Sequence, residues 1–276
     1  MPCDSTTHIE GRPLVVLDEM PSFHNQVRAC LWGTERVFQK VYENTDYWER
    51  ETTVLDHLVR TELYTVPQVR YRSRQQLMAL LTVVPGASLA TVDAVVCRQL
   101  AQSLSHIHNH QALVPRSRIA AMLRRFQENI AASEQLSDDE KRISGAAMCR
   151  LDQAGWIEET TGRHDLVHGD INVANVLHDT ATDHLGVLDF ERASVGDGML
   201  DLAKASWRIL HYDVGLTETL LGEYCGHLPT EQDWRRFTAA SIYECLGAVS
   251  YFAYEGHRKQ YPFKDTAISQ LERLCG

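Results

Sequence analysis

The stretch that decides the fold of this chain of 276 residues is LVHGDINVANVL at residues 166–177, followed by GVLDFE at residues 186–191. Residues 176–178 and 185–188 are short and mostly apolar, which is typical of strands. Residues 179–184 (DTATDH) lie between them and are typical of a polar turn. This pattern predicts an antiparallel hairpin.

A hairpin centred near Thr182 places Asn175 and Asp189 opposite each other at its open end. Asp170 then lies in the adjoining loop. Amide and carboxylate oxygens are the ligands that Mg²⁺ prefers when it carries a nucleotide phosphate. We therefore predict that Asn175 and Asp189 bind a metal ion and that Asp170 is left to accept a proton.

The order of these residues resembles a known family. His168-Gly169-Asp170, then Asn175, then LDFE at 188–191 look like the aminoglycoside phosphotransferase and choline kinase-like branch of the protein-kinase fold, with the resemblance spanning roughly residues 22–203. Either motif alone arises easily by chance, so the combination carries the inference. The resemblance implies ATP or GTP with Mg²⁺ as cofactors and Asp170 as the catalytic base, with His168 bracing the loop.

The N-terminal third has the pattern of a β-sheet with one helix. Trp48 and Leu55 mark the apolar face of the predicted helix, and Glu51 lies between them on that face. A carboxylate there is costly unless it is paired, and kinases use such a pair to hold a phosphate-binding lysine. The predicted strands are residues 14–17, 26–32, 36–42, 68–72 and 77–84, and the predicted helix is 46–60.

Lys40 lies within a predicted strand and is the partner that the kinase pattern requires for Glu51. The alternative is that Glu51 reaches solvent and that Glu49, or no residue, pairs with Lys40. The resemblance further implies that backbone groups around Thr82 and Val84 contact the nucleotide base.

The loop expected to cover the phosphates is residues 21–26, where Ser22 is the predicted nucleotide contact. This loop contains no glycine. Protein kinases carry a lysine at the position of Asn172 and a glycine at the position of Glu191, and no Ala-Pro-Glu follows Asp189. These departures favour a small-molecule kinase over a protein kinase.

Pro85 and Gly86 mark the predicted boundary between two lobes. Helical patterns follow at residues 91–108, 115–136 and 138–154 and resume from Met199. We therefore predict an α+β, bilobal, protein-kinase-like fold. Its small β-rich N-lobe spans residues 1–84, and its larger helical C-lobe spans residues 85–276.

The expected activity is transfer of the γ-phosphate of ATP or GTP to the hydroxyl of a small molecule, plausibly an aminoglycoside or another hydroxylated antibiotic. Kinases of choline, homoserine, thioribose or sugar-amines are alternatives within the family. A non-catalytic nucleotide-binding module and a Mg²⁺-dependent hydrolase using Asp170 and Asp189 are alternatives from other classes. The hydrolase would leave Lys40 without a role.

Composition supports these expectations. The net charge of −10 argues against a nucleic-acid partner and is compatible with a cationic acceptor. No apolar stretch reaches the roughly 20 residues that cross a bilayer, so no membrane association is expected. The seven cysteines are widely spaced without a CxxC pair, which favours reduced thiols and a cytoplasmic location. No pattern in the chain indicates an oligomeric state.

Overall fold

The computed structural model divides the chain into two compact units. The hairpin segment folds with the N-terminal part, so neither unit is one continuous stretch. The boundary at residues 84 and 85 therefore stays a prediction. Unit 1 comprises residues 1–91, 112–114 and 168–193, and unit 2 comprises residues 92–111, 115–167 and 194–276. The structure describes residues 7–21, 24–59, 65–89, 91–110, 114–116, 118–256 and 262–275.

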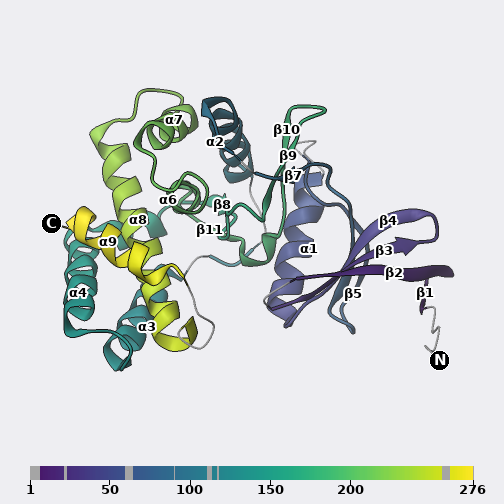
Figure 1. Cartoon of the computed structure of the whole chain (residues 1–276), viewed down its shortest axis with the longest axis horizontal. Coiled ribbons are helices and arrows are strands. Elements are labelled where there is room, and N and C mark those ends of the chain that lie inside the picture. The colour runs from purple at the N-terminus through teal and green to yellow at the C-terminus, as the bar shows by residue number, and fades with distance from the viewer. Residues whose placement is uncertain are drawn as a thin grey trace. The chain divides into compact units, whose positions relative to one another are not determined.

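Unit 1 contains a six-stranded antiparallel sheet in the order β1-β2-β3-β4-β6-β5 (Figure 1). The turn between β3 and β4 contains Gly33, whose φ of 64° suits a residue without a side chain. One face of the sheet is closed by a buried cluster that includes Cys30, Trp32, Val37 and Leu80. The strands are β1 Thr7–Ile9, β2 Arg12–Met20, β3 Gln26–Trp32, β4 Glu35–Val41, β5 Val69–Ser73 and β6 Met78–Thr82.

Helix α1 (Thr45–Val59) follows β4. Asn44 caps it, because its side-chain oxygen accepts the N–H of Tyr47 at 3.0 Å. Trp48 and Leu55 are buried, and so is Glu51 between them. The prediction of one buried helix face is therefore confirmed for these positions.

The predicted hairpin is formed by β9 (Val176–Asp179) and β10 (His184–Val187), with β7 (Ala87–Ser88) beside β9. The predicted register was wrong by one residue. The Leu188 N–H donates to the oxygen of Asn175 at 2.9 Å, so Leu188 rather than Asp189 lies opposite Asn175. A centre on Thr182 requires an odd number of loop residues, whereas β9 and β10 are joined by the four residues 180–183.

Unit 2 is mostly helical, and α8 is its central helix, packing against α3, α6 and α9. Many of its side chains are buried, including Phe237, Ile242 and Leu246. A small two-stranded sheet pairs β8 (Asp165–Val167) with β11 (Ser194–Gly196). The helices are α2 Ala94–His108, α3 Ile119–Ala132, α4 Asp138–Gln153, α5 Trp156–Thr161, α6 Met199–Arg208, α7 Val214–Cys225, α8 Glu231–Tyr251 and α9 Lys264–Cys275.

The predicted α+β class, with strands concentrated in the N-terminal region and helices in the C-terminal region, is confirmed. Among the residues that the structure describes, no helix combines the length and apolar character needed to span a bilayer.

Candidate active site

The side chain of Lys40, on β4, is surrounded by three carboxylates. Its Nζ lies 2.7 Å from Glu51 Oε2, 2.6 Å from Asp189 Oδ1 and 2.9 Å from Glu191 Oε2. The predicted pair of Lys40 with Glu51 is therefore present, and the alternative pairing with Glu49 is absent, because Glu49 contacts Arg74 instead. One ammonium against three carboxylates leaves a formal charge of −2 in this cluster, which we call the Lys40 cluster.

Burial and the neighbouring charges act in opposite directions on the Lys40 cluster. Burial alone would lower the pKa of Lys40, but Glu51, Asp189 and Glu191 outweigh it and raise that pKa. Burial raises the pKa of Glu51, although Lys40 opposes the rise. Burial would also raise the pKa of Asp189, but the ammonium of Lys40 lowers it below its usual value. Lys40 therefore stays charged and holds Asp189 as a carboxylate.

Asp170 lies in a loop that is fixed by hydrogen bonds on both sides. Asn175 Nδ2 donates to the Asp170 carbonyl at 2.9 Å and lies 3.5 Å from its carboxylate Oδ2. The Asp170 N–H donates to His168 Nδ1 at 3.1 Å, and His168 Nε2 lies 2.8 Å from the carbonyl of Leu188. Because a carbonyl can only accept, Nε2 carries the proton and Nδ1 is the acceptor. His168 therefore braces the loop, as predicted.

Two further residues shape the loop around Asp170. Gly169 has a φ of 81°, and a Cβ there would lie 2.6 Å from the carbonyl oxygen of Arg192, so only glycine fits. Burial alone would lower the pKa of Arg192, but the Asp170 carboxylate raises it, followed by Tyr47 and Glu191. The Arg192 guanidinium therefore interacts electrostatically with the predicted base. No motif in the sequence indicated Arg192.

The structure describes two of the three predicted nucleotide contacts, Thr82 and Val84. Thr82 ends β6, and its N–H donates to the carbonyl of Gln68 at 2.9 Å, so this N–H is already used within the sheet. Val84 is buried and packs against Gly186, where a Cβ would lie 2.4 Å from Val84 Cγ1. The predicted base contacts at Thr82 and Val84 stay predictions. Ser22 lies outside the described residues.

The sheet face around Lys40 is apolar. Directly paired residues of an antiparallel sheet point to the same face, and Lys40 pairs with Val27 on β3 and Ala79 on β6. Two residues along, Phe38 pairs with Ala29, so both lie on that same face. Val27, Ala29 and Phe38 are half-buried. Their alternation within β3 and β4 was visible in the sequence, but only the register links them to Lys40.

The donors present fit a divalent cation. Oxygen atoms of Glu51, Asp189 and Glu191 all lie within 4.8 Å of one another, and Lys40 Nζ already lies within 2.9 Å of each. The remaining excess of negative charge favours a divalent cation beside the cluster. The structure places Asp189 in this group and places Asn175 against Asp170. Glu191 was seen in the sequence only as a departure from a motif, and its contact with Lys40 was missed.

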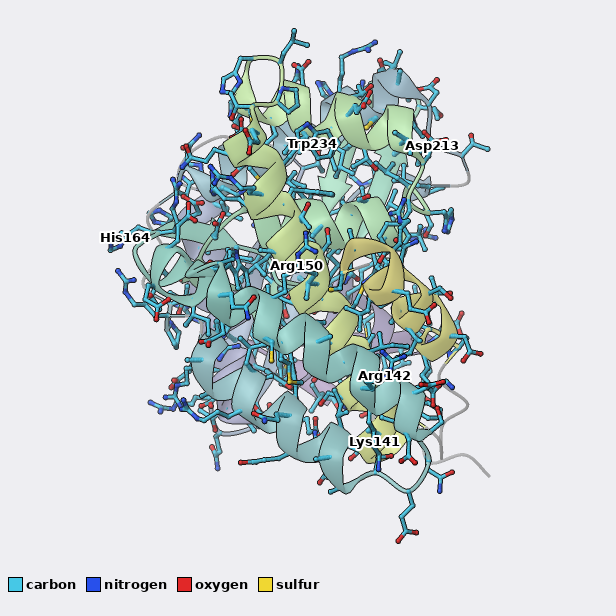
Figure 2. All side chains as sticks on the ribbon, turned by 90° about the vertical axis from the view of Figure 1, so that its left-hand side faces the viewer. Lys141, Arg142, Arg150, His164, Asp213 and Trp234 are labelled. Carbon is cyan, nitrogen blue, oxygen red and sulfur yellow. The ribbon has the colours of Figure 1, made fainter. Side chains whose placement is uncertain are left out.

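Unit 2 contains a cavity of about 320 Å³ between α6, α7, α8 and α9. It lies beside Trp234 on α8, labelled in Figure 2 together with Asp213 at the start of α7. Tyr212 and Phe237 also line it, as does the cation Arg273. The residues described as lining it include no carboxylate, so this cavity does not favour a cationic acceptor.

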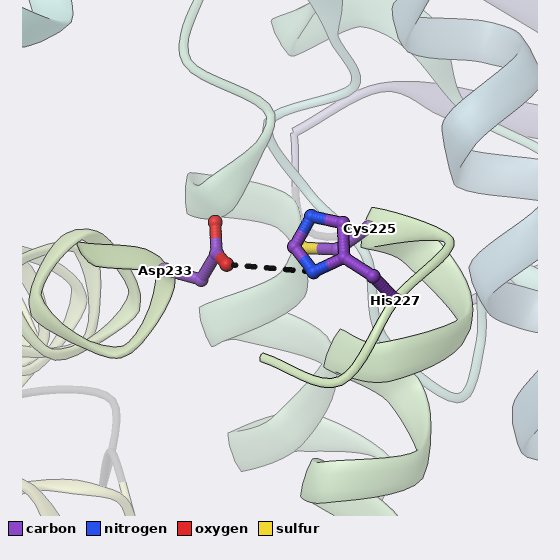
Figure 3. Close-up of side chains that lie close together, drawn as sticks. All are labelled: Cys225, His227 and Asp233. Carbon is purple, nitrogen blue, oxygen red and sulfur yellow. Dashed lines mark ion pairs between the residues drawn. The ribbon is translucent and has the colours of Figure 1, made fainter. Parts of the chain in front are cut away.

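A second group of possible metal ligands, Cys225, His227 and Asp233, also lies in unit 2 (Figure 3). Asp233 Oδ2 already accepts from the N–H and the hydroxyl of Thr230, as the cap of α8. His227 Nδ1 lies 2.9 Å from the carbonyl of Leu228 and therefore donates its proton there. Burial raises the pKa of Cys225 to about 11, so the thiol keeps its proton. These groups stabilise a turn and do not form a ready metal site.

Residues 22–239 match the profile of a protein family described as the phosphotransferase enzyme family. No curated protein matches the chain in sequence.

Several solved structures are similar to the chain. The GDP complex of aminoglycoside 2'-phosphotransferase-IIIa has a TM-score of 0.71 at 16% identity, covering 95% of this chain and 91% of that one. A choline/ethanolamine kinase family protein from Mesorhizobium loti has a TM-score of 0.70 at 14% identity, with coverages of 94% and 87%. Macrolide 2'-phosphotransferase MphH from Brachybacterium faecium has a TM-score of 0.65 at 17% identity, with coverages of 93% and 91%. The predicted protein-kinase-like fold is confirmed.

Proposed function

The chain belongs to the phosphotransferase enzyme family, and we propose that it transfers the γ-phosphate of ATP or GTP to a hydroxyl group of a small molecule. The observation that carries this proposal is the Lys40 cluster. In it, a strand lysine paired with a helix carboxylate lies 2.6 Å from Asp189, which follows the β9–β10 hairpin. Kinases use such a set to position a nucleotide and its metal ion.

Each residue of the site has a role in this proposal. Lys40, oriented by Glu51, binds the nucleotide phosphates, and Thr82 and Val84 lie beside the base. Asn175 and Asp189 would hold Mg²⁺, which when bound would supply positive charge to neutralise the transferred phosphoryl group.

Asp170 orients the acceptor hydroxyl and accepts its proton. The Asn175 amide and the bracing of His168 hold Asp170 in place for this step.

The proposed acceptor is an aminoglycoside or another hydroxylated antibiotic. Structural neighbours that carry the names of aminoglycoside and macrolide phosphotransferases support this class. A neighbour of the choline/ethanolamine kinase family supports the alternative of a small amino alcohol. The two classes differ in size and in the number of hydroxyl groups, so a panel that includes both separates them.

The test is a nucleotide-consumption assay with ATP and GTP against aminoglycosides, macrolides and amino alcohols. The proposal expects acceptor-dependent release of diphosphate together with a phosphorylated acceptor in the mass spectrum. Asp170→Ala should lower kcat by about 10³-fold while the thermal unfolding curve stays unchanged, since general base catalysis contributes on this scale. Full activity of Asp170→Ala, or release of phosphate to water with every acceptor, would refute the proposal.

A further inference from the structure

One oxygen of Glu191 joins two parts of unit 1. Glu191 Oε2 lies 2.9 Å from Lys40 Nζ and also accepts a hydrogen bond from Asn25 Nδ2. Asn25 directly precedes β3, at the end of the loop expected to cover the nucleotide phosphates. The other end of the Asn25 amide is held as well, because its Oδ1 accepts the N–H of Glu43 at 3.1 Å.

Glu191 itself is held firmly by α1. The carbonyl of Glu191 accepts from Arg50 Nη1 at 3.3 Å, and the N–H of the preceding Phe190 donates to Glu51 Oε1 at 3.2 Å. The side chain of Glu191 is only 6% exposed. These contacts fix both the backbone and the carboxylate of Glu191.

A phosphate that approaches Lys40 competes with carboxylates for the three N–H groups of the ammonium, because Glu51 and Asp189 accept hydrogen bonds from Nζ and Glu191 lies 2.9 Å away as an ion pair. Glu51 is 1% exposed and its second oxygen is bonded to Phe190. Asp189, in contrast, is 31% exposed and is the proposed metal ligand. Asp189 is therefore the carboxylate that gives way, whereas Glu191 stays.

We propose that Glu191 is a positioning residue that ties the phosphate loop, through Asn25, to Lys40. This contact would position the phosphate loop, as glycine residues do in the glycine-rich loops of other nucleotide-binding proteins. A glycine-rich loop approaches phosphates through its backbone freedom, whereas this loop is anchored at its end by a side chain. The inference rests on the proposed function, since it assumes that Lys40 binds nucleotide phosphates.

Four variants separate the tie from the charge of Glu191. Asn25→Ala and Glu191→Ala each break the hydrogen bond between the two residues. Glu191→Gln removes the charge but keeps a carbonyl oxygen, which can accept from Asn25 as Oε2 does now and can remain beside Lys40. Glu19→Gln is the matched control, because Glu19 lies on β2 before the same loop, is exposed, and contacts Arg28 at 2.8 Å and Gln26 at 3.5 Å.

The first measurement is the Kd for ATP with Mg²⁺ by titration calorimetry. Asn25→Ala and Glu191→Ala should each weaken binding about tenfold, since a hydrogen bond to a charged group is of this strength. The double variant should be no weaker than either single one, because both remove the same contact. Glu191→Gln should weaken binding less than Glu191→Ala does, and Glu19→Gln should stay within about threefold of wild type. Wild-type affinity in both alanine variants, or fully additive losses, would overturn the tie.

The second measurement needs no nucleotide. The Glu43 N–H is protected from hydrogen exchange only while Asn25 is held, so Glu191→Ala should speed its exchange about tenfold and Glu191→Gln should not. Unchanged exchange in Glu191→Ala would contradict the tie. If wild type binds no nucleotide while this exchange still changes, the proposed function fails and the tie stands.

Discussion

Buried charges are arranged differently in the two units. In unit 1, Lys40 faces three carboxylates, and the cluster carries a formal charge of −2. In unit 2, Arg236 on α8 meets the buried Asp197 with two nitrogens, at 2.7 Å and 3.3 Å, so these two charges match. The other carboxylate near Arg236, that of Glu159, is 3.9 Å away and 38% exposed. Asp197 also accepts the N–H of Met199 at 3.0 Å, which leaves it well satisfied.

A buried charge pair that serves stability differs from a buried charge cluster that serves function. A matched, hydrogen-bonded pair can hold helices together with nothing else present. An excess of buried negative charge costs stability and is tolerated where a positively charged ligand completes the site. The excess, more than the presence of charge, therefore points to the Lys40 cluster as the working part of the molecule.

The largest effect should come from Lys40→Met, which leaves two buried carboxylates and the half-buried Asp189 without a cation. We expect the free energy of unfolding to fall by about 3–5 kcal/mol at pH 8. A carboxyl whose folded pKa is raised gives stability at low pH that is lost as the pH rises, so the fall should be smaller at pH 5. Urea unfolding at both pH values measures this, with Lys141→Met as control, because Lys141 is only half-buried and donates to the carbonyl of Ala131 at 3.4 Å. Equal losses at both pH values would mean that the excess charge is not the cause.

The second largest effect is expected from a substitution that breaks the pair of Arg236 with Asp197. Arg236→Met should lower the free energy of unfolding by about 3 kcal/mol, because it leaves Asp197 buried without its partner. The Kd for nucleotide should stay within about twofold of wild type, since this pair belongs to the stability of unit 2. Calorimetric titration below the unfolding temperature measures the Kd for nucleotide. A tenfold change in Kd would show that the two charge groups are not independent.

A smaller effect is expected on the loss of folding stability at acidic pH. The lowered pKa of Asp189 gives stability that is present above the pKa of an unfolded Asp, about 4, and lost as the pH falls through the folded value. Asp189→Asn cannot protonate, so it should lose less stability than wild type between pH 5 and pH 3. Glu51, with its raised pKa, is present in both proteins and acts in the opposite direction. Parallel stability curves in this range would contradict the assignment.

The smallest effect belongs to an exposed pair that serves as a baseline for both units. Arg74 and Glu49 lie 2.7 Å apart, and their side chains are 71% and 45% exposed. Glu49→Ala should change the free energy of unfolding by about 0.5 kcal/mol or less, because water screens such pairs. Urea unfolding at neutral pH checks it, and a loss above about 2 kcal/mol would undermine the distinction between buried and exposed charges.

Much of the fold could be predicted from local pattern. Strand β3 spans the predicted residues 26–32, and α1 begins and ends within one residue of the predicted 46–60. Alternation and capping are local signals, so they can be recognised from the sequence alone. The register of β9 with β10 was missed by one residue, because the length of a loop does not by itself fix how a turn closes.

The site was predicted in part. Lys40 with Glu51 followed from the cost of a carboxylate on an apolar helix face, and the resemblance to the aminoglycoside phosphotransferase family is confirmed by the family match. Arg192 and the tie between Asn25 and Glu191 could not be predicted. The 166 positions that separate Asn25 from Glu191 in sequence are closed only by the tertiary fold.

The most direct test of the charge-excess account is calorimetric titration of wild-type protein with ATP and with GTP, each with and without Mg²⁺. A cluster of formal charge −2 repels a bare triphosphate, so the Kd should be at least about 10²-fold lower with Mg²⁺ than without it. Equal affinity under both conditions, or no binding of either nucleotide, would contradict the account.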